Sequence, residues 1–572
     1  MTLLLPPPSA PSVPSAPSAP AVPAPVSDRQ QQRRVPGTLA AFVLGAVVAA
    51  AASMYTVKHG TNLDYGDARA HLSIARRVFD SKAPGLAQLG SVWLPVPHLL
   101  LLPLVADLWM FETGVAGCVL GSLCLGASSA ALWRITARLG IAGPGRVVAI
   151  VVLLANPSLL YVSTTALTEP VLVACVLCTI AGLAGWARSS RQLSGGELAV
   201  FAGLPAALGV LTRYEAWAVA LAGTILVVIV SRRRGHTWRR SLTWAASFAA
   251  PSAVAMSWWL AYNAAVFGNP LEFLDGQYAA AAFTDVFEAQ GRLTTRGNLG
   301  LSSTVYGRAL LETAGLLPLV IAAAGLLMTC WRWGLDNRAL ITWLGATTSA
   351  FLLFSLVTGQ HIMVNEASLP PGAYNNRYVL SAGPWVALLC ALAVEHVREV
   401  SRELGRGRVR GARVLPAVTV AVLAVVGASL VVQNLWWARD PMGRMTILTE
   451  AGDQHVDHVV MRRPALWLRD HYDGGDVLMD QTPADFTLAP DIGLPLQDFY
   501  TRSVGDLFDV AIVDPYTHAR WVVMHLTPIE GGATETSRDL VSDHLALDPQ
   551  FHARYRLVWS EGTVGIYRRT DS

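Results

Sequence analysis

Side chains that could do chemistry gather in five short clusters between long apolar runs. Carboxylates can accept protons, and arginine guanidinium groups can bind a phosphate through two parallel hydrogen bonds. Charged groups close to a membrane are costly, so such clusters mark candidate sites. The clusters are Asp64-Tyr65-Gly66-Asp67-Ala68-Arg69-Ala70-His71, Trp93-Leu94-Pro95-Val96-Pro97-His98, Thr168-Glu169-Pro170, Arg213-Tyr214-Glu215 and Tyr374-Asn375-Asn376-Arg377-Tyr378.

The composition is that of an integral membrane protein. Of 572 residues, 53% are hydrophobic and only 15% are charged, whereas soluble globular chains carry about 25% charged residues. The net charge is only +3, and the basic residues concentrate in a few short loops, which argues against a nucleic-acid-binding face. All six cysteines lie in apolar runs, so no internal disulfide is expected in the C-terminal part.

Apolar runs alternate with Arg-rich connectors in a pattern that predicts about eleven transmembrane helices. If the first span (35–57) runs outward from Arg33 and Arg34, every Arg-rich connector falls on the cytoplasmic side, as the positive-inside rule requires. The proline-containing segment 94–110 is predicted to be broken or interfacial, because prolines interrupt helices. Counting it as a span would also move every later Arg-rich connector to the opposite side of the membrane. The five clusters then lie on the extracytoplasmic side.

Two segments flank the predicted membrane domain, residues 35–437. Residues 1–34 are rich in Pro, Ala and Ser, which predicts a disordered cytoplasmic tail. Residues 438–572 contain strand-length apolar runs such as 476–480 and 521–525, which predict a small extracytoplasmic α/β domain. The expected fold class is therefore an all-α polytopic membrane protein with an α/β domain at its C-terminus. Abundant Arg, Ala and Gly suggest a high-GC bacterium, and hence the plasma membrane.

The arrangement of the clusters resembles the GT-C superfamily of polyprenyl-phosphate-dependent glycosyltransferases. The likeness is greatest to the branch of protein O-mannosyltransferases and lipid A aminoarabinose transferases. It rests on an acidic motif after the first span, a proline-containing segment, a Thr-Glu-Pro element, an Arg-Tyr-Glu hairpin tip and a late Arg-Tyr pair. The resemblance covers about residues 36–440. It implies a membrane glycosyltransferase that takes a sugar from a polyprenyl-phosphate donor.

Such a transfer needs a carboxylate to take the acceptor's proton and cations to stabilise the departing phosphate. We assign Asp67 as the base, with an N-terminal helix cap as its alternative role. The family's second acidic position is Ala68 here, which makes Asp64 the candidate replacement. Glu169 is predicted either to hold the base or a sugar hydroxyl, or to stabilise the N-terminus of the helix near Pro170.

Arg213 and Arg377 are the candidate phosphate ligands, because guanidinium groups keep their charge and bind phosphate through two donors. Their alternative role is interfacial snorkelling, or pairing with Glu215 and Glu366. His71 and His98 are predicted to contact phosphate or acceptor, or to act as polar anchors. The substrate-binding candidates are His71, His98, Arg213, Tyr214, Glu215, Asn376 and Arg377.

Asp64, Asp67 and Glu169 offer hard oxygen ligands that suit magnesium or manganese, although no ligand spacing requires a metal. The predicted partners are a polyprenyl-phosphate-sugar donor and an envelope glycan, lipid or protein acceptor. One alternative is a transporter or flippase of a lipid-linked saccharide, a class that commonly shows internal repeats and polar groups at the membrane midplane. A catalytically inactive envelope scaffold is a third reading, which Ala68 leaves open.

Overall fold

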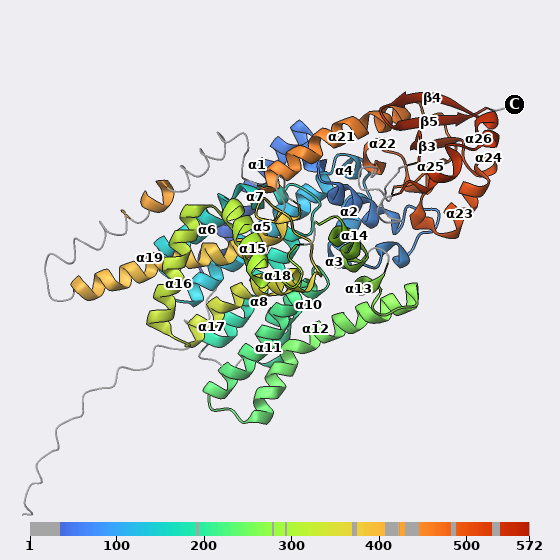
Figure 1. The fold of residues 1–572 in the computed structure, drawn as a ribbon. Coiled ribbons are helices and arrows are strands. Elements are labelled where there is room, and N and C mark those ends of the chain that lie inside the picture. The colour runs from blue at the N-terminus through green and yellow to red at the C-terminus, as the bar shows by residue number, and fades with distance from the viewer. Residues whose placement is uncertain are drawn as a thin grey trace, which may run out of the picture. The chain divides into compact units, whose positions relative to one another are not determined.

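A computed structural model describes residues 35–572 apart from 190–193, 277–278, 292–293, 369–373, 406–420, 422–423, 429–445, 482–487, 529–537 and 571–572. The described residues are mostly helical, with one small sheet near the C-terminus (Figure 1). The helices of the first half are α1 (Thr38–His59), η1 (Thr61–Leu63), α2 (Gly66–Arg77), η2 (Leu86–Leu89), α3 (Val96–Val105), α4 (Leu108–Glu112), α5 (Val115–Arg138), α6 (Gly143–Leu154), α7 (Pro157–Val162), α8 (Glu169–Arg188), α9 (Gly195–Leu198), η3 (Ala199–Gly203), α10 (Leu204–Val210), α11 (Glu215–Arg233) and α12 (Trp238–Phe267).

The second half continues with further helices and five strands. They are α13 (Glu272–Asp275), α14 (Ala280–Ala289), α15 (Leu299–Ala314), α16 (Leu316–Trp333), α17 (Asn337–Trp343), η4 (Leu344–Ala346), α18 (Thr347–Thr358), η5 (Asn376–Ala382), α19 (Gly383–Gly405), α21 (Thr446–His471), β1 (Val477–Met479), α22 (Ala489–Ile492), η7 (Leu496–Asp498), β2 (Phe499–Tyr500), η8 (Arg502–Val504), α23 (Asp506–Val513), α24 (Pro515–His518), β3 (Trp521–His525), α25 (Leu540–Leu545), α26 (Pro549–Arg554), β4 (Tyr555–Glu561) and β5 (Val564–Arg569).

Predicted spans one to ten each fall on one helix or on consecutive helical segments. Seven helical stretches of the described chain are long and apolar enough to cross a membrane, and shorter apolar helices accompany them. Most of the predicted eleventh span lies outside the described residues, as do the predicted tail and the proposed domain boundary at residue 437. The protein is therefore a polytopic membrane protein. Segment 94–110, which was not counted as a span, forms the two short helices α3 and α4.

Local sequence explains where two predicted spans depart from a single α-helix. The predicted third span, about residues 147–162, is divided between α6 and α7 because Pro157 cannot continue a helix. Asn156 caps the new helix by accepting a hydrogen bond from the Leu159 N–H at 2.9 Å. The fifth span contains a π-helical turn at Ala199–Gly203, followed by Pro205. Both breaks lie in otherwise apolar helices.

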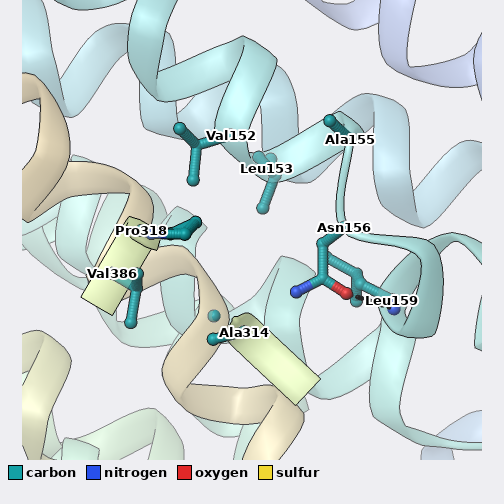
Figure 2. Close-up of a pocket in the computed structure, with 9 residues that line it drawn as sticks. Val152, Leu153, Ala155, Asn156, Leu159, Ala314, Pro318 and Val386 are labelled. Carbon is teal, nitrogen blue, oxygen red and sulfur yellow. Dashed lines mark hydrogen bonds between the residues drawn. The ribbon is translucent and has the colours of Figure 1, made fainter. Parts of the chain in front are cut away.

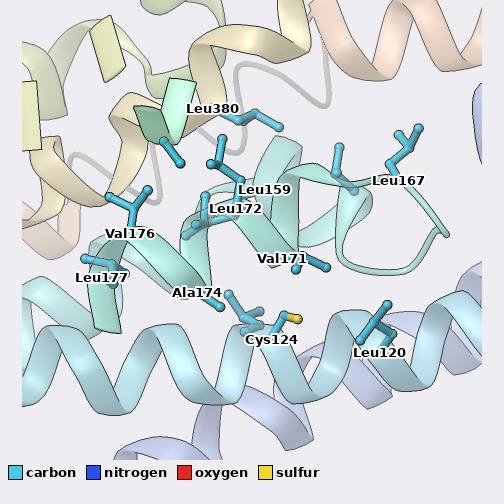
Figure 3. Packing of buried hydrophobic residues seen from close by; sticks show 14 of the residues in the cluster. Leu120, Cys124, Leu159, Leu167, Val171, Leu172, Ala174, Val176, Leu177 and Leu380 are labelled. Atoms are coloured by element: carbon cyan, nitrogen blue, oxygen red, sulfur yellow. The ribbon is translucent and has the colours of Figure 1, made fainter. Parts of the chain in front are cut away.

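Close helix contacts hold the membrane part together. Helix α5 packs between α1 and α8, and Figure 3 shows Leu120 and Cys124 of α5 facing Val171 and Ala174 of α8. A Cβ at Gly121 would lie 2.0 Å from the Ser163 carbonyl oxygen. Such small-residue contacts are the usual means of helix association in a bilayer, where apolar surface alone gives little driving force.

The Arg-rich connectors meet at one end of the helix bundle, called the basic end here. Arg188 donates to the Arg138 carbonyl at 3.3 Å, and Arg233 donates to the Leu335 carbonyl at 2.7 Å. These four residues belong to connectors that the positive-inside rule assigned to one side. The contacts agree with the chain path that the rule predicted.

The C-terminal sheet has the strand order β2-β1-β3-β5-β4. Strands β1, β2 and β3 are parallel neighbours, whereas β5 is antiparallel to both β3 and β4. Every residue of β3 is buried, which explains its continuous apolar run. Strands β1 and β3 match the predicted runs 476–480 and 521–525. Strands β4 and β5 match two further apolar runs that the sequence predicts as strands, 555–559 and 564–567. The two-residue strand β2 was not predicted, because it is too short to show a periodic pattern.

Candidate active site at the ends of the membrane helices

The acidic and basic clusters meet at the other end of the bundle, called the site end here. Glu169 begins α8, where Pro170 occupies a first-turn position that suits its fixed φ. Arg213 lies just before α11, and Arg377 lies in η5, which leads into α19. Asn375 precedes η5 with φ of 60°, a left-handed conformation that asparagine tolerates better than most residues.

Glu169 joins the two arginines. Its Oε1 accepts a hydrogen bond from Arg213 Nη1 at 3.1 Å and lies 3.2 Å from Arg377 Nε. Arg213 also donates through Nε to Glu215 at 3.0 Å and through Nη1 to Thr168 at 3.0 Å. Burial alone would lower the pKa of Arg213, but Glu215 and Glu169 raise it above its usual value. Arg213 is therefore a fixed cation within a buried network.

Asp67 is the most exposed carboxylate of this network. It lies in the first turn of α2 and forms an ion pair with Arg377. The Asp67 side chain is 36% exposed, whereas the Arg377 side chain is only 6% exposed. The N-cap residue of α2 is Tyr65 and not Asp67. The geometry thus favours an ion-paired carboxylate over the alternative role of helix cap.

Two tyrosine rings form walls beside the arginines. The Arg377 guanidinium lies 5.2 Å from the Tyr65 ring centroid and 5.8 Å from that of Tyr378. The Tyr378 ring also lies 4.9 Å from Arg213. Aromatic faces stabilise cations and exclude water around them. Tyr65 and Tyr378 were present in the sequence motifs but were not selected as site residues.

His71 and His98 form a buried pair next to the network. His71 Nδ1 lies 2.8 Å from His98 Nε2, and the His71 ring centroid lies 4.5 Å from that of Trp93. Burial, with a further effect of Arg377 and Arg213, lowers the pKa of His71 to about 3. The pair is therefore neutral, with one ring donating to the other. His98 Nδ1 has no hydrogen-bond partner among the described residues.

The remaining predicted substrate-binding residues make structural contacts. The Tyr214 hydroxyl donates to the Val92 carbonyl at 3.1 Å, and the Tyr214 ring stacks on Phe273. The buried Asn376 amide donates to the Val364 carbonyl at 3.3 Å. Both residues thus hold loops of the site end in place.

Asp64 points into a second cluster on the other side of the loop before α2. Its Oδ1 lies 2.7 Å from His455 Nδ1 and 3.8 Å from His458 Nδ1. The other nitrogen of His458 lies 2.9 Å from Asp491 Oδ2. Asp64 therefore connects the loop before α2 to α21 and α22. In this arrangement it does not take the place of a second carboxylate beside Asp67.

Glu450 on α21 is the carboxylate that the sequence interpretation missed. It is buried, and its Oε1 accepts a hydrogen bond from the Asn375 N–H at 3.3 Å. Burial raises its pKa to about 7, and the attraction of Arg377 offsets only part of that effect. Its Oε2 has no hydrogen-bond partner among the described residues. Nothing in the local sequence marks Glu450, because it lies in an ordinary helix far from every motif.

The three carboxylates considered as metal ligands do not converge. Asp64 contacts His455, Asp67 pairs with Arg377, and Glu169 pairs with both arginines. In the part of the chain that the structure describes, no group of three or more His, Cys, Asp and Glu residues is placed to hold a metal ion. These residues therefore do not fit a magnesium or manganese site as they stand.

A separate small cavity lies between α6, α7, α15, α16 and α19 (Figure 2). It is lined mainly by apolar side chains such as Val152, Leu153 and Pro318, and holds about 10 Å³. That volume suits at most one water molecule. Its polar member, Asn156, donates to the Thr313 carbonyl at 3.1 Å. This cavity is a packing feature, distinct from the charged network.

Comparison with known proteins supports the fold. No protein-family model and no curated protein sequence matches the chain. The structure is similar to that of ArnT from Cupriavidus metallidurans bound to undecaprenyl phosphate, with a TM-score of 0.53 and 15% sequence identity over 94% of this chain and 98% of that chain. The fold class that the sequence predicted is thus confirmed: a polytopic helical membrane protein with a small α/β region at its C-terminus.

Proposed function

We propose that this protein is a membrane glycosyltransferase that moves a sugar from a polyprenyl-phosphate carrier to an envelope acceptor on the extracytoplasmic face. The observation that carries the proposal is the buried network of Arg213, Arg377 and Glu169, with the partly exposed Asp67 at its edge. A lipid donor reaches such a site from the bilayer, and a polar acceptor reaches it from water. The similar fold of a protein bound to undecaprenyl phosphate supports this donor class.

Arg377 and Asp67 suggest how donor binding prepares the reaction. A donor phosphate is the stronger ligand for a guanidinium group, because it offers several charged oxygens. Its approach to Arg377 would displace Asp67, while Glu169 keeps the arginine in place. The freed Asp67 carboxylate would then be available as a base. The ion pair thus keeps the base occupied until donor is present.

The transfer itself follows from these positions. An acceptor hydroxyl oxygen attacks the anomeric carbon of the sugar, and its proton passes to Asp67. The bond from the anomeric carbon to the phosphate oxygen breaks, and the electron pair leaves with the polyprenyl phosphate. Arg377 and Arg213 stabilise the charge that develops on this leaving group.

Glu450 is our candidate for the second carboxylate of the site. Burial places its pKa close to neutral pH, so it can exchange a proton without a large energetic cost. We assign it the role of relaying the acceptor proton from Asp67 towards water. His71 and His98, a neutral pair, are proposed to donate a hydrogen bond to the sugar or the acceptor.

The proposed setting follows from the same topology. The Arg-rich connectors of the basic end would face the cytoplasm, and the site end and the C-terminal sheet would face outward across the plasma membrane. Residues 438–572 would form a separate extracytoplasmic domain that contributes α21 to the site.

The direct test is transfer of labelled sugar in proteoliposomes that contain the purified protein, polyprenyl-phosphate-sugar donors and an envelope extract as acceptor. Asp67→Asn keeps the shape of the side chain but cannot take a proton. We expect labelled product from the wild type and a loss of roughly 10²–10⁴-fold in the variant, the usual contribution of a general base. Asp453→Asn is the matched control, because Asp453 is an exposed carboxylate on α21.

Two results would overturn the proposal. Equal product from wild type and Asp67→Asn would remove Asp67 from the chemistry. Absence of product, together with movement of labelled donor lipid across the vesicle membrane, would favour a flippase. Donor panels with different sugars then identify the carrier-linked substrate.

A further inference from the structure

A second cavity, lined by several cationic side chains, lies beside the contact between His458 and Asp64. It has a volume of about 330 Å³, within the range of small-ligand sites in proteins. The cavity lies where the C-terminal end of α1 meets α4, α21 and α22. Its charged and histidine lining residues are Lys58, His59, Glu112, His458, Arg462, Arg469 and Asp491.

Positive charge exceeds negative charge around this cavity. Lys58, Arg462 and Arg469 face the two carboxylates of Glu112 and Asp491. Asp491 is already shared between Arg462, whose Nε lies 3.0 Å away, and His458 at 2.9 Å.

His458 is a further basic group in the lining of this cavity. Burial lowers the pKa of His458, but its hydrogen bonds to Asp491 and Asp64 outweigh that effect and raise it above its usual value. Burial also raises the pKa of Glu112, against an opposing effect of Arg469. By residue type alone, the lining carries a net positive charge, with one lysine and two arginines against two carboxylates.

The cations come from two elements that are far apart in the sequence. Lys58 and His59 are the last residues of the apolar helix α1, and Gly60 ends that helix with φ of 72°. A Cβ at Gly60 would meet only Arg462 Nη1, at 4.0 Å. The guanidinium of α21 thus reaches the end of α1 beside Lys58. An anion at this point would tie the first membrane helix to the C-terminal part of the chain.

We propose that this cavity binds a phosphate group through Lys58, Arg462 and Arg469, which all line it. Lysine and arginine from separate elements suit a phosphate, which accepts hydrogen bonds from several directions. The end of α1 marks the expected boundary of the bilayer, so the phosphate of a lipid headgroup and free phosphate are the two possible sources. This inference goes beyond the proposed function, since binding here needs no turnover.

The test measures binding in the absence of any sugar donor. The full chain is purified in nanodiscs of phosphatidylcholine with and without phosphatidylglycerol, and retained lipid is measured by native mass spectrometry. Inorganic phosphate is titrated in parallel against chloride at equal ionic strength, with thermal unfolding as the readout. The test variant is the double substitution Lys58→Gln and Arg469→Gln, which leaves the Asp491 pairs intact.

A matched control removes the same charge elsewhere. Arg463→Gln with Arg556→Gln takes two positive charges from exposed positions outside the cavity, one of them next to Arg462 in the sequence. We expect binding to weaken by roughly tenfold or more in the test variant, because even one lost charged hydrogen bond costs about tenfold, and to stay unchanged in the control.

The possible outcomes distinguish a lipid phosphate from free phosphate, and binding from its absence. Retention of phosphatidylglycerol that only the test variant loses supports a lipid headgroup, and stabilisation by inorganic phosphate that only the test variant loses supports free phosphate. Equal binding by all three proteins, or equal losses in test and control variants, overturns the inference. Neither readout uses sugar transfer, so this failure is distinguishable from failure of the proposed function.

Discussion

Arg377 in η5 forms an ion pair with Asp67 in α2, and the two residues stand 310 positions apart in the chain. Arg377 also lies 3.2 Å from Glu169 at the start of α8. One guanidinium therefore holds together three segments of the site end.

Replacement of Arg377 should separate its role in stability from its proposed role in phosphate binding. Arg377→Gln leaves carboxylates without their cation, and breaking a buried ion pair costs about 3–5 kcal/mol. Arg377→Lys keeps the charge but not the planar fork, so we expect a smaller loss of stability and a clear loss of transfer. Unfolding temperature and sugar transfer measure the two effects. Arg296→Gln, which breaks an exposed pair with Glu288, serves as the control and should change little. Equal stability of Arg377→Gln and Arg296→Gln would contradict the buried network.

Glu450 should make stability and activity depend on pH. Burial first, against a partial offset by Arg377, raises its pKa from 4.5 to about 7. Between these values the folded protein binds a proton that the unfolded chain does not, so wild-type stability falls as pH rises through this window. Glu450→Gln is neutral throughout. Its unfolding temperature relative to the wild type should therefore increase from about pH 5 to about pH 8.

Glu450→Gln should also remove the proposed proton relay from the transfer reaction. Wild-type transfer should rise with pH through about 7 as Glu450 ionises, and Glu450→Gln should be slower and lack this rise. Asp453→Asn, on the same helix but exposed, should follow the wild type in both measurements. A Glu450→Gln profile identical to that of the wild type would exclude Glu450 from proton transfer.

Asp64 and Asp67 should behave differently although they are three residues apart. Asp64 contacts His455 and His458 of α21, so Asp64→Asn should lower the unfolding temperature and leave most of the transfer activity. Asp67→Asn should lower activity far more than stability. The comparison needs only the transfer assay and a thermal melt on the two variants. The reverse pattern would assign Asp64 as the base.

Two helix glycines test the membrane packing. A Cβ at Gly121 on α5 would lie 2.0 Å from the Ser163 carbonyl oxygen, whereas a Cβ at Gly185 on α8 would meet nothing within 4 Å. Gly121→Ala should therefore destabilise by about 1–3 kcal/mol through overpacking. Gly185→Ala should be neutral or stabilise by up to about 1 kcal/mol, the helix-propensity difference. Thermal unfolding in detergent compares them, and a tolerated Gly121→Ala would show that α5 can shift.

Local patterns anticipated much of the fold. Long apolar runs and Arg-rich connectors need no tertiary contacts to be recognised, because burial in lipid and the charge rule act on each segment separately. Predicted spans one to ten accordingly lie on helices, and four of the five strands of the C-terminal sheet match predicted runs. Asn156 and Pro157 signal a helix break in the sequence, but the apolar residues around them led to the prediction of one continuous span.

The sequence by itself determined the membrane class, the path of the chain and the residue types able to transfer a proton or bind phosphate. Only the tertiary structure decided which of them meet. Asp67, Glu169, Arg213 and Arg377 share one network, whereas Asp64 turns to the histidines of α21. Glu450 joins the site from a helix that carries no motif. Its raised pKa comes from burial, and burial is set by packing between segments that are distant in the sequence.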